Sequence, residues 1–229
     1  VHHTAAWLQK RFQIVVEVMP IAFPIPKSQG QNVFIEALQT KLAELPQPDK
    51  LKMIVLDHMV SIPAVKEPVA ELAAMVKAFQ PRCFVLVDGA HTLGQLVDLN
   101  LPTKIGNIDA YLSNGHKWLY SPKGSAFLWI NTTSGFVTDT FPEPTVISSA
   151  NSISSMGETT TSTPLIQRFA YVSSRDYTLY AMGQYGCGTR LSPIDPGRRC
   201  RHLSILSDLG PPSQTLLEAI MECHTLGTR

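Results

Sequence analysis

A carboxylate and an amine follow two neighbouring apolar runs of the chain, where their side chains could act on the same ligand. Asp88 ends the run at 83–87 and is followed at once by Gly89. Lys117 lies in the polar segment 113–118, directly after a second apolar run. Apolar runs of four to eight residues closed by a turn residue predict buried strands, and open α/β sheets bind ligands outside the carboxyl ends of such strands. We therefore expect Asp88 and Lys117 to flank one ligand site.

This pair suits the chemistry of pyridoxal phosphate (PLP). A lysine amine forms a Schiff base with the cofactor's aldehyde, and a carboxylate keeps the pyridine nitrogen protonated so that the ring accepts electrons. The alternatives are a solvated loop lysine and an aspartate that only caps the next segment. Asp88 and His91 could also belong to a metal site or a hydrolase dyad, but no third ligand has suitable spacing and Thr92 is the only nearby candidate nucleophile. We therefore favour PLP and predict no metal site.

Strand and helix patterns alternate through the first half of the chain, which indicates parallel βαβ units and an α/β fold class. The link before the last strand contains Gly and Pro and is too short for a crossover helix. We therefore expect a mostly parallel sheet whose last strand is antiparallel. The predicted strands are 12–19, 51–56, 83–88, 108–113 and 126–130, and the predicted helices are 31–45 and 68–79.

Three motifs within residues 12–180 resemble the class V aminotransferase family of PLP enzymes: V-D-G-A-H-x-x-G-Q, S-N-x-H-K-W and P-K-G-x-A-F-L. The likeness is greatest to the isopenicillin-N-epimerase-like and cysteine-desulfhydrase-like branch. It implies a partial large domain of the type I PLP fold at 1–147 and a Ser/Thr-rich loop with a return segment at 148–182. An irregular remnant of a truncated or degraded small C-terminal domain would follow at 183–229.

The resemblance also implies roles for individual side chains. Lys117 would carry the Schiff base and remove the substrate's Cα proton, Asp88 would bind the pyridine nitrogen, and His91 would lie near the ring oxygen and the substrate. For the other histidines and serines, the residues alone leave open a structural role as loop caps or core hydrogen-bonding groups. The implied cofactor contacts are Ser61, Asn114, His116 and Ser174, and the implied substrate contacts are His58 and Arg175.

The function that the resemblance implies is an enzyme acting on an amino acid or a cysteine-derived substrate, as a homodimer. Transamination, epimerisation and C–S lyase chemistry all remain open. The alternative is a non-catalytic, truncated remnant that binds PLP weakly or not at all. It is motivated by the absence of a glycine-rich phosphate loop before Phe12 and of a core pattern over 183–213.

The composition argues against several other classes of protein. Of 229 residues, 44% are hydrophobic, the formal net charge is +1, and no apolar stretch approaches the roughly 18 residues of a membrane span. We therefore expect neither nucleic acid nor a membrane as partner. The four cysteines lack metal-binding spacing, and Cys83 falls in a predicted core strand, which favours a reduced, cytoplasmic protein.

Overall fold

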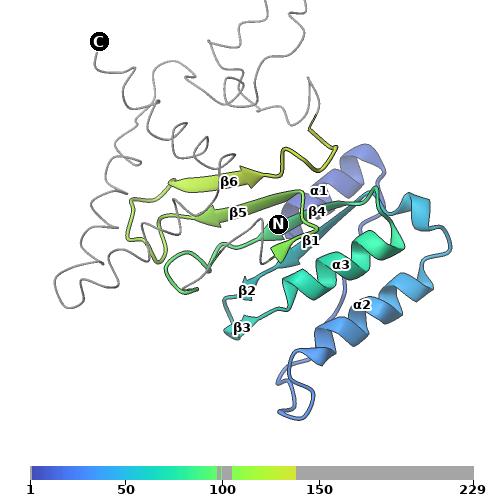
Figure 1. Cartoon of the computed structure of the whole chain (residues 1–229), viewed down its shortest axis with the longest axis horizontal. Helices are drawn as coiled ribbons and strands as arrows, with labels where there is room; N and C mark the ends of the chain where they lie inside the picture. Colours follow the sequence, from blue (N-terminus) through green and yellow to red (C-terminus); the bar gives the residue numbers. More distant parts are fainter. Residues whose placement is uncertain (1, 97–98, 100–104, 138–229) are drawn as a thin grey trace, which may run out of the picture.

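The computed structural model describes residues 2–96, 99 and 105–137 of the 229-residue chain (Figure 1). The predicted segments 148–182 and 183–229, and with them Ser174 and Arg175, lie outside the described residues. The elements in chain order are α1 (His2–Phe12), α2 (Asn32–Glu44), a 3₁₀ turn η1 (Pro48–Lys50), β1 (Met53–Asp57), β2 (Met59–Val60), β3 (Val65–Lys66), α3 (Val69–Phe79), β4 (Phe84–Asp88), β5 (Ala110–Asn114) and β6 (Ala126–Ile130).

Four of these strands form one sheet in the order β1-β4-β5-β6 (Figure 1). β1, β4 and β5 run parallel, and β6 runs antiparallel to β5. The predicted α/β class, with a mostly parallel sheet and a reversed last strand, is thus confirmed. The register places Asp57 beside Asp88 at the carboxyl ends of β1 and β4. This sheet edge is the one at which the sequence predicts the ligand site.

Helices α2 and α3 lie side by side against one face of this sheet (Figure 1). On α3, Val69, Leu72, Ala73 and Val76 recur at helical spacing and are at most 3% exposed. They pack in one hydrophobic cluster with Val85 and Val87 of β4, Leu56 of β1, and Phe34 and Leu38 of α2. Among the described residues, no helix is both long and apolar enough to cross a membrane.

The predicted strand at 12–19 is wrong. Helix α1 extends to Phe12, and residues 13–20 follow it without regular secondary structure. Ile14, Val15 and Val18 are 45%, 80% and 56% exposed, respectively. Strand-favouring side chains are not sufficient, because a strand also needs a neighbouring strand to bond its backbone. Neither α1 nor the small β2–β3 hairpin was expected from the sequence.

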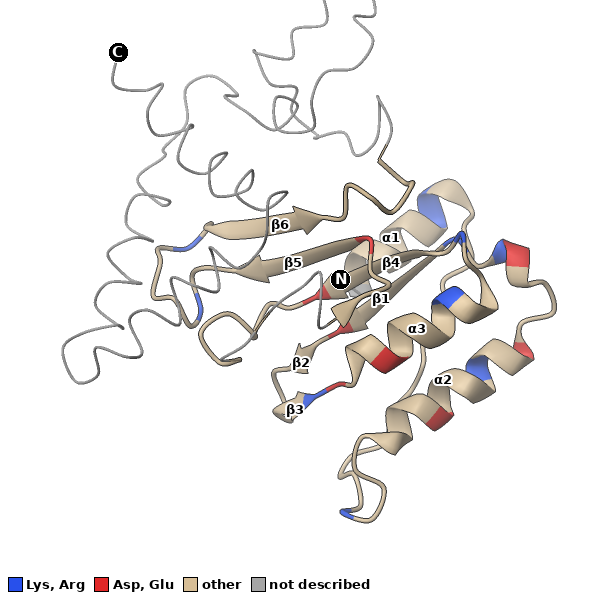
Figure 2. Cartoon of the chain, viewed as in Figure 1, with Lys and Arg blue, Asp and Glu red and all other residues tan. Residues whose placement is uncertain are grey.

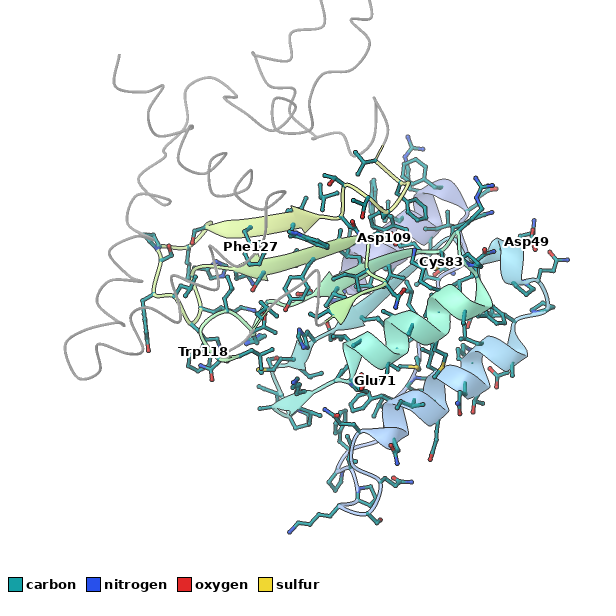
Figure 3. The ribbon with its side chains drawn as sticks, viewed as in Figure 1. Asp49, Glu71, Cys83, Asp109, Trp118 and Phe127 are labelled. Carbon is teal, nitrogen blue, oxygen red and sulfur yellow. The ribbon has the colours of Figure 1, made fainter. Side chains whose placement is uncertain are left out.

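A buried ion pair fastens α3 to the end of the sheet that is opposite the candidate site. Lys77 Nζ lies 2.7 Å from Asp109 Oδ2 and donates a second hydrogen bond to the Cys83 carbonyl at 2.8 Å. The same Asp109 oxygen accepts the backbone N–H of Val85 at 2.7 Å. Figure 3 shows Asp109 and Cys83 together near one end of the strands, and Trp118, on the turn after β5, at the other. The contacts of Lys77 and Asp109 therefore lie at the end of the sheet away from the candidate site.

Candidate cofactor site

The candidate site lies where β4 and β5 end. Asp88 is the last residue of β4, and the chain then turns through Gly89 to His91. Lys117 lies in the turn that follows β5, three residues after Asn114. Figure 2 shows lysine on the loop between β5 and β6 and acidic residues at the ends of the neighbouring strands. The βαβ topology thus brings to one edge the groups that the sequence singles out.

Lys117 and His91 are in direct contact, with Nζ of the lysine 2.9 Å from Nε2 of the histidine. Burial and, second, the positive charge of Lys117 lower the pKa of His91, against the opposing effects of Asp88 and Asp57. A neutral imidazole accepts a hydrogen bond from the lysine ammonium through Nε2, which leaves its own ring proton on Nδ1. The structure therefore brings together two of the three predicted catalytic residues, and the charge of the third acts on His91.

Asp88 is fixed through one side of its carboxylate and through its backbone. Its Oδ1 accepts the backbone N–H of Ala90 at 3.0 Å, and its carbonyl accepts the backbone N–H of His58 at 2.8 Å. Within the described residues, Oδ2 accepts no hydrogen bond. A carboxylate held in this way can receive a further donor without giving up its anchor.

Two of the other predicted cofactor contacts lie on the segment leading to Lys117, and the third lies on the β2–β3 hairpin. Asn114 ends β5 and is half-buried, and His116 lies in the same turn as Lys117, with Nδ1 3.2 Å from the Ser125 carbonyl oxygen. Ser61 is exposed in the turn of the β2–β3 hairpin. Its contact with the cofactor stays a prediction.

His58 lies in the core instead of on an open surface. Its side chain is 4% exposed, and its Nδ1 lies 2.9 Å from the hydroxyl of Tyr111. Burial and, second, the charge of Lys66 lower the pKa of His58 to about 4. This placement does not fit the substrate contact predicted for His58, because the ring is enclosed by protein and already hydrogen-bonded.

Glu67 is a buried acid near this edge that the sequence interpretation missed. It is 8% exposed, and its backbone N–H donates to the carbonyl of His58 at 3.1 Å. Burial and, second, the charge of Asp57 raise the pKa of Glu67 to about 8. The sequence gives no sign of this, since a single glutamate before a helix-starting proline is typical of a solvated cap. Glu67 directly follows β3, and the hairpin brings its backbone into contact with His58, the residue after β1.

The folded chain should lose stability between pH 6.5 and 8. The raised pKa of Glu67 gives stability that is complete below its ordinary pKa of 4.5 and is lost as the pH rises toward 8. The lowered pKa of His58 gives stability that is present above 6.5 and is lost as the pH falls toward 4. Between pH 4.5 and 6.5 the effects of the two groups oppose each other. Above pH 6.5, of these two groups only Glu67 still changes the stability, and it lowers the free energy of unfolding by up to about 1.4 kcal/mol per pH unit.

Urea unfolding at a series of pH values checks this expectation. Glu67→Gln, which cannot ionise, should flatten the decline above pH 6.5 and should be more stable than the unmodified chain at pH 8. Glu71→Gln is the matched control, because Glu71 is exposed on α3 and should leave the decline unchanged. An equally steep decline in Glu67→Gln would show that Glu67 is not the responsible group.

The side chains at this edge of the sheet are of the types that bind an organic cofactor. They offer an amine, an imidazole in hydrogen-bond contact with that amine, and a carboxylate that is held at Oδ1 by the Ala90 N–H. The part of the chain that the structure describes contains no group of three or more His, Cys, Asp or Glu side chains that could hold a metal ion. The chemistry that these residues can perform together is covalent capture of a carbonyl by Lys117 and transfer of protons through Lys117 and His91.

The fold and this edge define an α/β protein with a lysine–aspartate site at the carboxyl ends of parallel strands. No family model matches the chain. It is 34% identical over 126 residues to putative L-cysteine desulfhydrase 1 of Oryza sativa subsp. japonica, covering 54% of this chain and 24% of that protein. It is 36% identical over 113 residues to the L-cysteine desulfhydrase of Arabidopsis thaliana, covering 48% and 23%. The predicted resemblance to cysteine-desulfhydrase-like proteins is therefore confirmed over about half of the chain.

The matched segment spans about a quarter of the length of these relatives. Among solved structures, the apo cysteine desulfurase from Thermococcus onnurineus NA1 is similar with a TM-score of 0.40 and 19% identity, covering 84% of this chain and 36% of that one. The similarity to the desulfhydrases therefore rests on sequence matches that cover about half of this chain.

Proposed function

We propose that this chain forms the ring-binding part of a PLP-dependent enzyme of the cysteine-desulfhydrase type, with Lys117 as the lysine that joins the cofactor. The observation that carries the proposal is the 2.9 Å contact between Lys117 and His91 at the edge where Asp88 ends β4. The proposed substrate is an amino acid or a cysteine-derived compound, handled by C–S lyase, transamination or epimerisation chemistry. We further propose a cytoplasmic homodimer, as the family resemblance implies.

The residues present fit PLP. The open Oδ2 of Asp88 suits a protonated ring nitrogen, because Oδ1 is already held by the backbone of Ala90. The Lys117 amine suits the cofactor's aldehyde, and Asn114, on the segment leading to Lys117, offers amide donors for the phosphate. His116, predicted as a second phosphate contact, already uses Nδ1 on the Ser125 carbonyl. When bound, PLP supplies an electron-accepting ring that stabilises negative charge on the substrate.

The protein's own groups supply the proton transfers. Neutral His91 accepts a hydrogen bond from the Lys117 ammonium at Nε2 and so holds Nζ in place. Once it has lost its proton, the lysine amine can attack a carbonyl carbon. Lys117 Nζ can later accept the proton that leaves the substrate's Cα and return it. Asp88 would accept a hydrogen bond from the protonated ring nitrogen of the bound cofactor.

Reductive labelling tests the proposal. The 229-residue chain is incubated with PLP, reduced with borohydride and digested, and the modified lysine is mapped by mass spectrometry. We expect the cofactor on Lys117 and not on Lys123, which is exposed on the same loop. Lys117→Arg should abolish both the label and the visible absorbance of lysine-bound cofactor, and Lys123→Arg should leave both unchanged. Labelling spread over exposed lysines, or no label at all, would overturn the assignment.

A further inference from the structure

Three buried side chains form a hydrogen-bonded chain beneath the candidate site. His58 Nδ1 lies 2.9 Å from the Tyr111 hydroxyl, that hydroxyl lies 2.7 Å from Thr92 Oγ1, and Thr92 Oγ1 lies 2.7 Å from the Gly89 carbonyl oxygen. The side chains of His58, Tyr111 and Thr92 are 4%, 0% and 0% exposed. The chain of contacts links the end of β1, strand β5 and the segment that follows β4.

The three contacts determine where the protons lie. The Gly89 carbonyl can only accept, so the Thr92 hydroxyl must donate to it, and Thr92 Oγ1 must then accept from Tyr111. The Tyr111 oxygen in turn accepts from His58, which requires a proton on Nδ1. Any other arrangement leaves two oxygens 2.7 Å apart with no proton between them. Neutral His58 is therefore the Nδ1–H tautomer.

Backbone hydrogen bonds connect this chain to the site. The N–H of His58 donates to the Asp88 carbonyl at 2.8 Å, and the N–H of Gly89 donates to the Leu112 carbonyl at 2.8 Å. The N–H of Thr92 donates to the Gly89 carbonyl at 2.9 Å. The segment 88–92 is thus held at both ends. It carries the carboxylate of Asp88 and the imidazole of His91, and the imidazole contacts Lys117.

We propose that His58, Tyr111 and Thr92 are positioning residues, which hold the segment 88–92 so that Asp88 and His91 keep their places relative to Lys117. Any effect of this positioning on catalysis rests on the proposed function, whereas the positioning of the segment 88–92 itself does not. The sequence predicts a substrate contact for His58, offers Thr92 only as the nucleophile of the disfavoured hydrolase alternative, and predicts no role for Tyr111. The lowered pKa of His58 agrees with a ring that stays neutral in this chain of contacts.

Nitrogen NMR of the isotopically labelled 229-residue chain tests the proton arrangement without a cofactor. The ring nitrogens of His58 should show a protonated Nδ1 and an unprotonated Nε2 at neutral pH. Tyr111→Phe, which removes the acceptor of that proton, should shift His58 toward the Nε2–H tautomer. An Nε2–H tautomer in the unmodified chain would overturn the proposal.

The same samples report on positioning through the pKa of His91. This pKa is lowered by burial and by Lys117, and it is raised by Asp88 and Asp57. In Tyr111→Phe, a loosened segment 88–92 should let the pKa of His91 rise toward its ordinary value. Thr40→Val is the control, because it removes a hydroxyl that is exposed on α2, and it should leave the pKa of His91 unchanged. An unchanged pKa in folded Tyr111→Phe would contradict the proposal.

A second pair of variants keeps the test decisive if Tyr111→Phe does not fold. Thr92→Val removes the hydroxyl at nearly constant volume, whereas Thr92→Ser retains it. We expect Thr92→Val to raise the pKa of His91 and to weaken PLP uptake about tenfold, and Thr92→Ser to restore both. If the unmodified chain takes up no PLP, the proposed function fails, but the NMR measurements still decide the positioning role. Equal behaviour of the two Thr92 variants would refute that role.

Discussion

Replacing Gly89 with alanine should destabilise the folded chain by about 3 kcal/mol or more, because the position has no room for a methyl group. A Cβ atom there would lie 2.2 Å from the Tyr111 hydroxyl oxygen and 2.3 Å from two carbons of its ring. Tyr111 is fully buried and is held by His58 and Thr92, so the ring cannot move aside without breaking the hydrogen-bonded chain beneath the site. Urea unfolding followed by circular dichroism measures the loss.

Two further variants show whether the ring is the cause. Gly115→Ala places a Cβ 2.8 Å from the Ser125 hydroxyl, a small group that can rotate away, so its cost should be much smaller. Tyr111→Phe should not rescue Gly89→Ala, because the clashing ring carbons remain. A Gly89→Ala chain that unfolds at the same urea concentration as the unmodified protein would mean that Tyr111 does not pack over this turn.

The sequence predicts the sheet well because each central element carries a complete local signal. The run at 83–88 is apolar and ends on Asp-Gly, and β4 occupies 84–88. The reversal of β6 follows from the short Gly/Pro-containing link before it, and the register confirms it. The segment 12–19 fails for the opposite reason. Its β-branched residues resemble a strand, but no described strand pairs with them, and pairing is not a local property.

In the candidate site, too, some residues could be predicted from local sequence patterns and others could not. Asp88, His91 and Lys117 are recognisable because strand ends and short spacings place them, and the structure brings His91 and Lys117 into contact. The partners of Tyr111 could not be predicted, since His58 is 53 residues away in the sequence and Thr92 is 19 residues away. Such contacts depend on the order and register of strands β1, β4 and β5, which no local pattern specifies.

The second large effect should come from Asp109, at the opposite end of the same strands. Asp109→Ala removes the acceptor of Lys77 and of the Val85 N–H together, and it leaves a mostly buried ammonium without its partner. Breaking a buried pair by removing one member typically costs about 3–5 kcal/mol. Because the side chain of Lys77 is 18% exposed, some solvation of its charge remains and the loss should fall near the lower end of that range.

A double-mutant cycle in urea unfolding measures this pair. Lys77→Met replaces the ammonium by an apolar side chain, so the double variant Lys77→Met/Asp109→Ala should be considerably more stable than the sum of the two single losses implies. Asp109→Asn keeps an oxygen for the Val85 N–H but loses the charge, and it should lie between Asp109→Ala and the unmodified chain. Because this pair contacts neither His91 nor Lys117, folded Asp109→Asn should also keep the lowered pKa of His91. Strictly additive losses in the cycle would mean that Lys77 and Asp109 do not stabilise each other and that the charge of Lys77 is solvated.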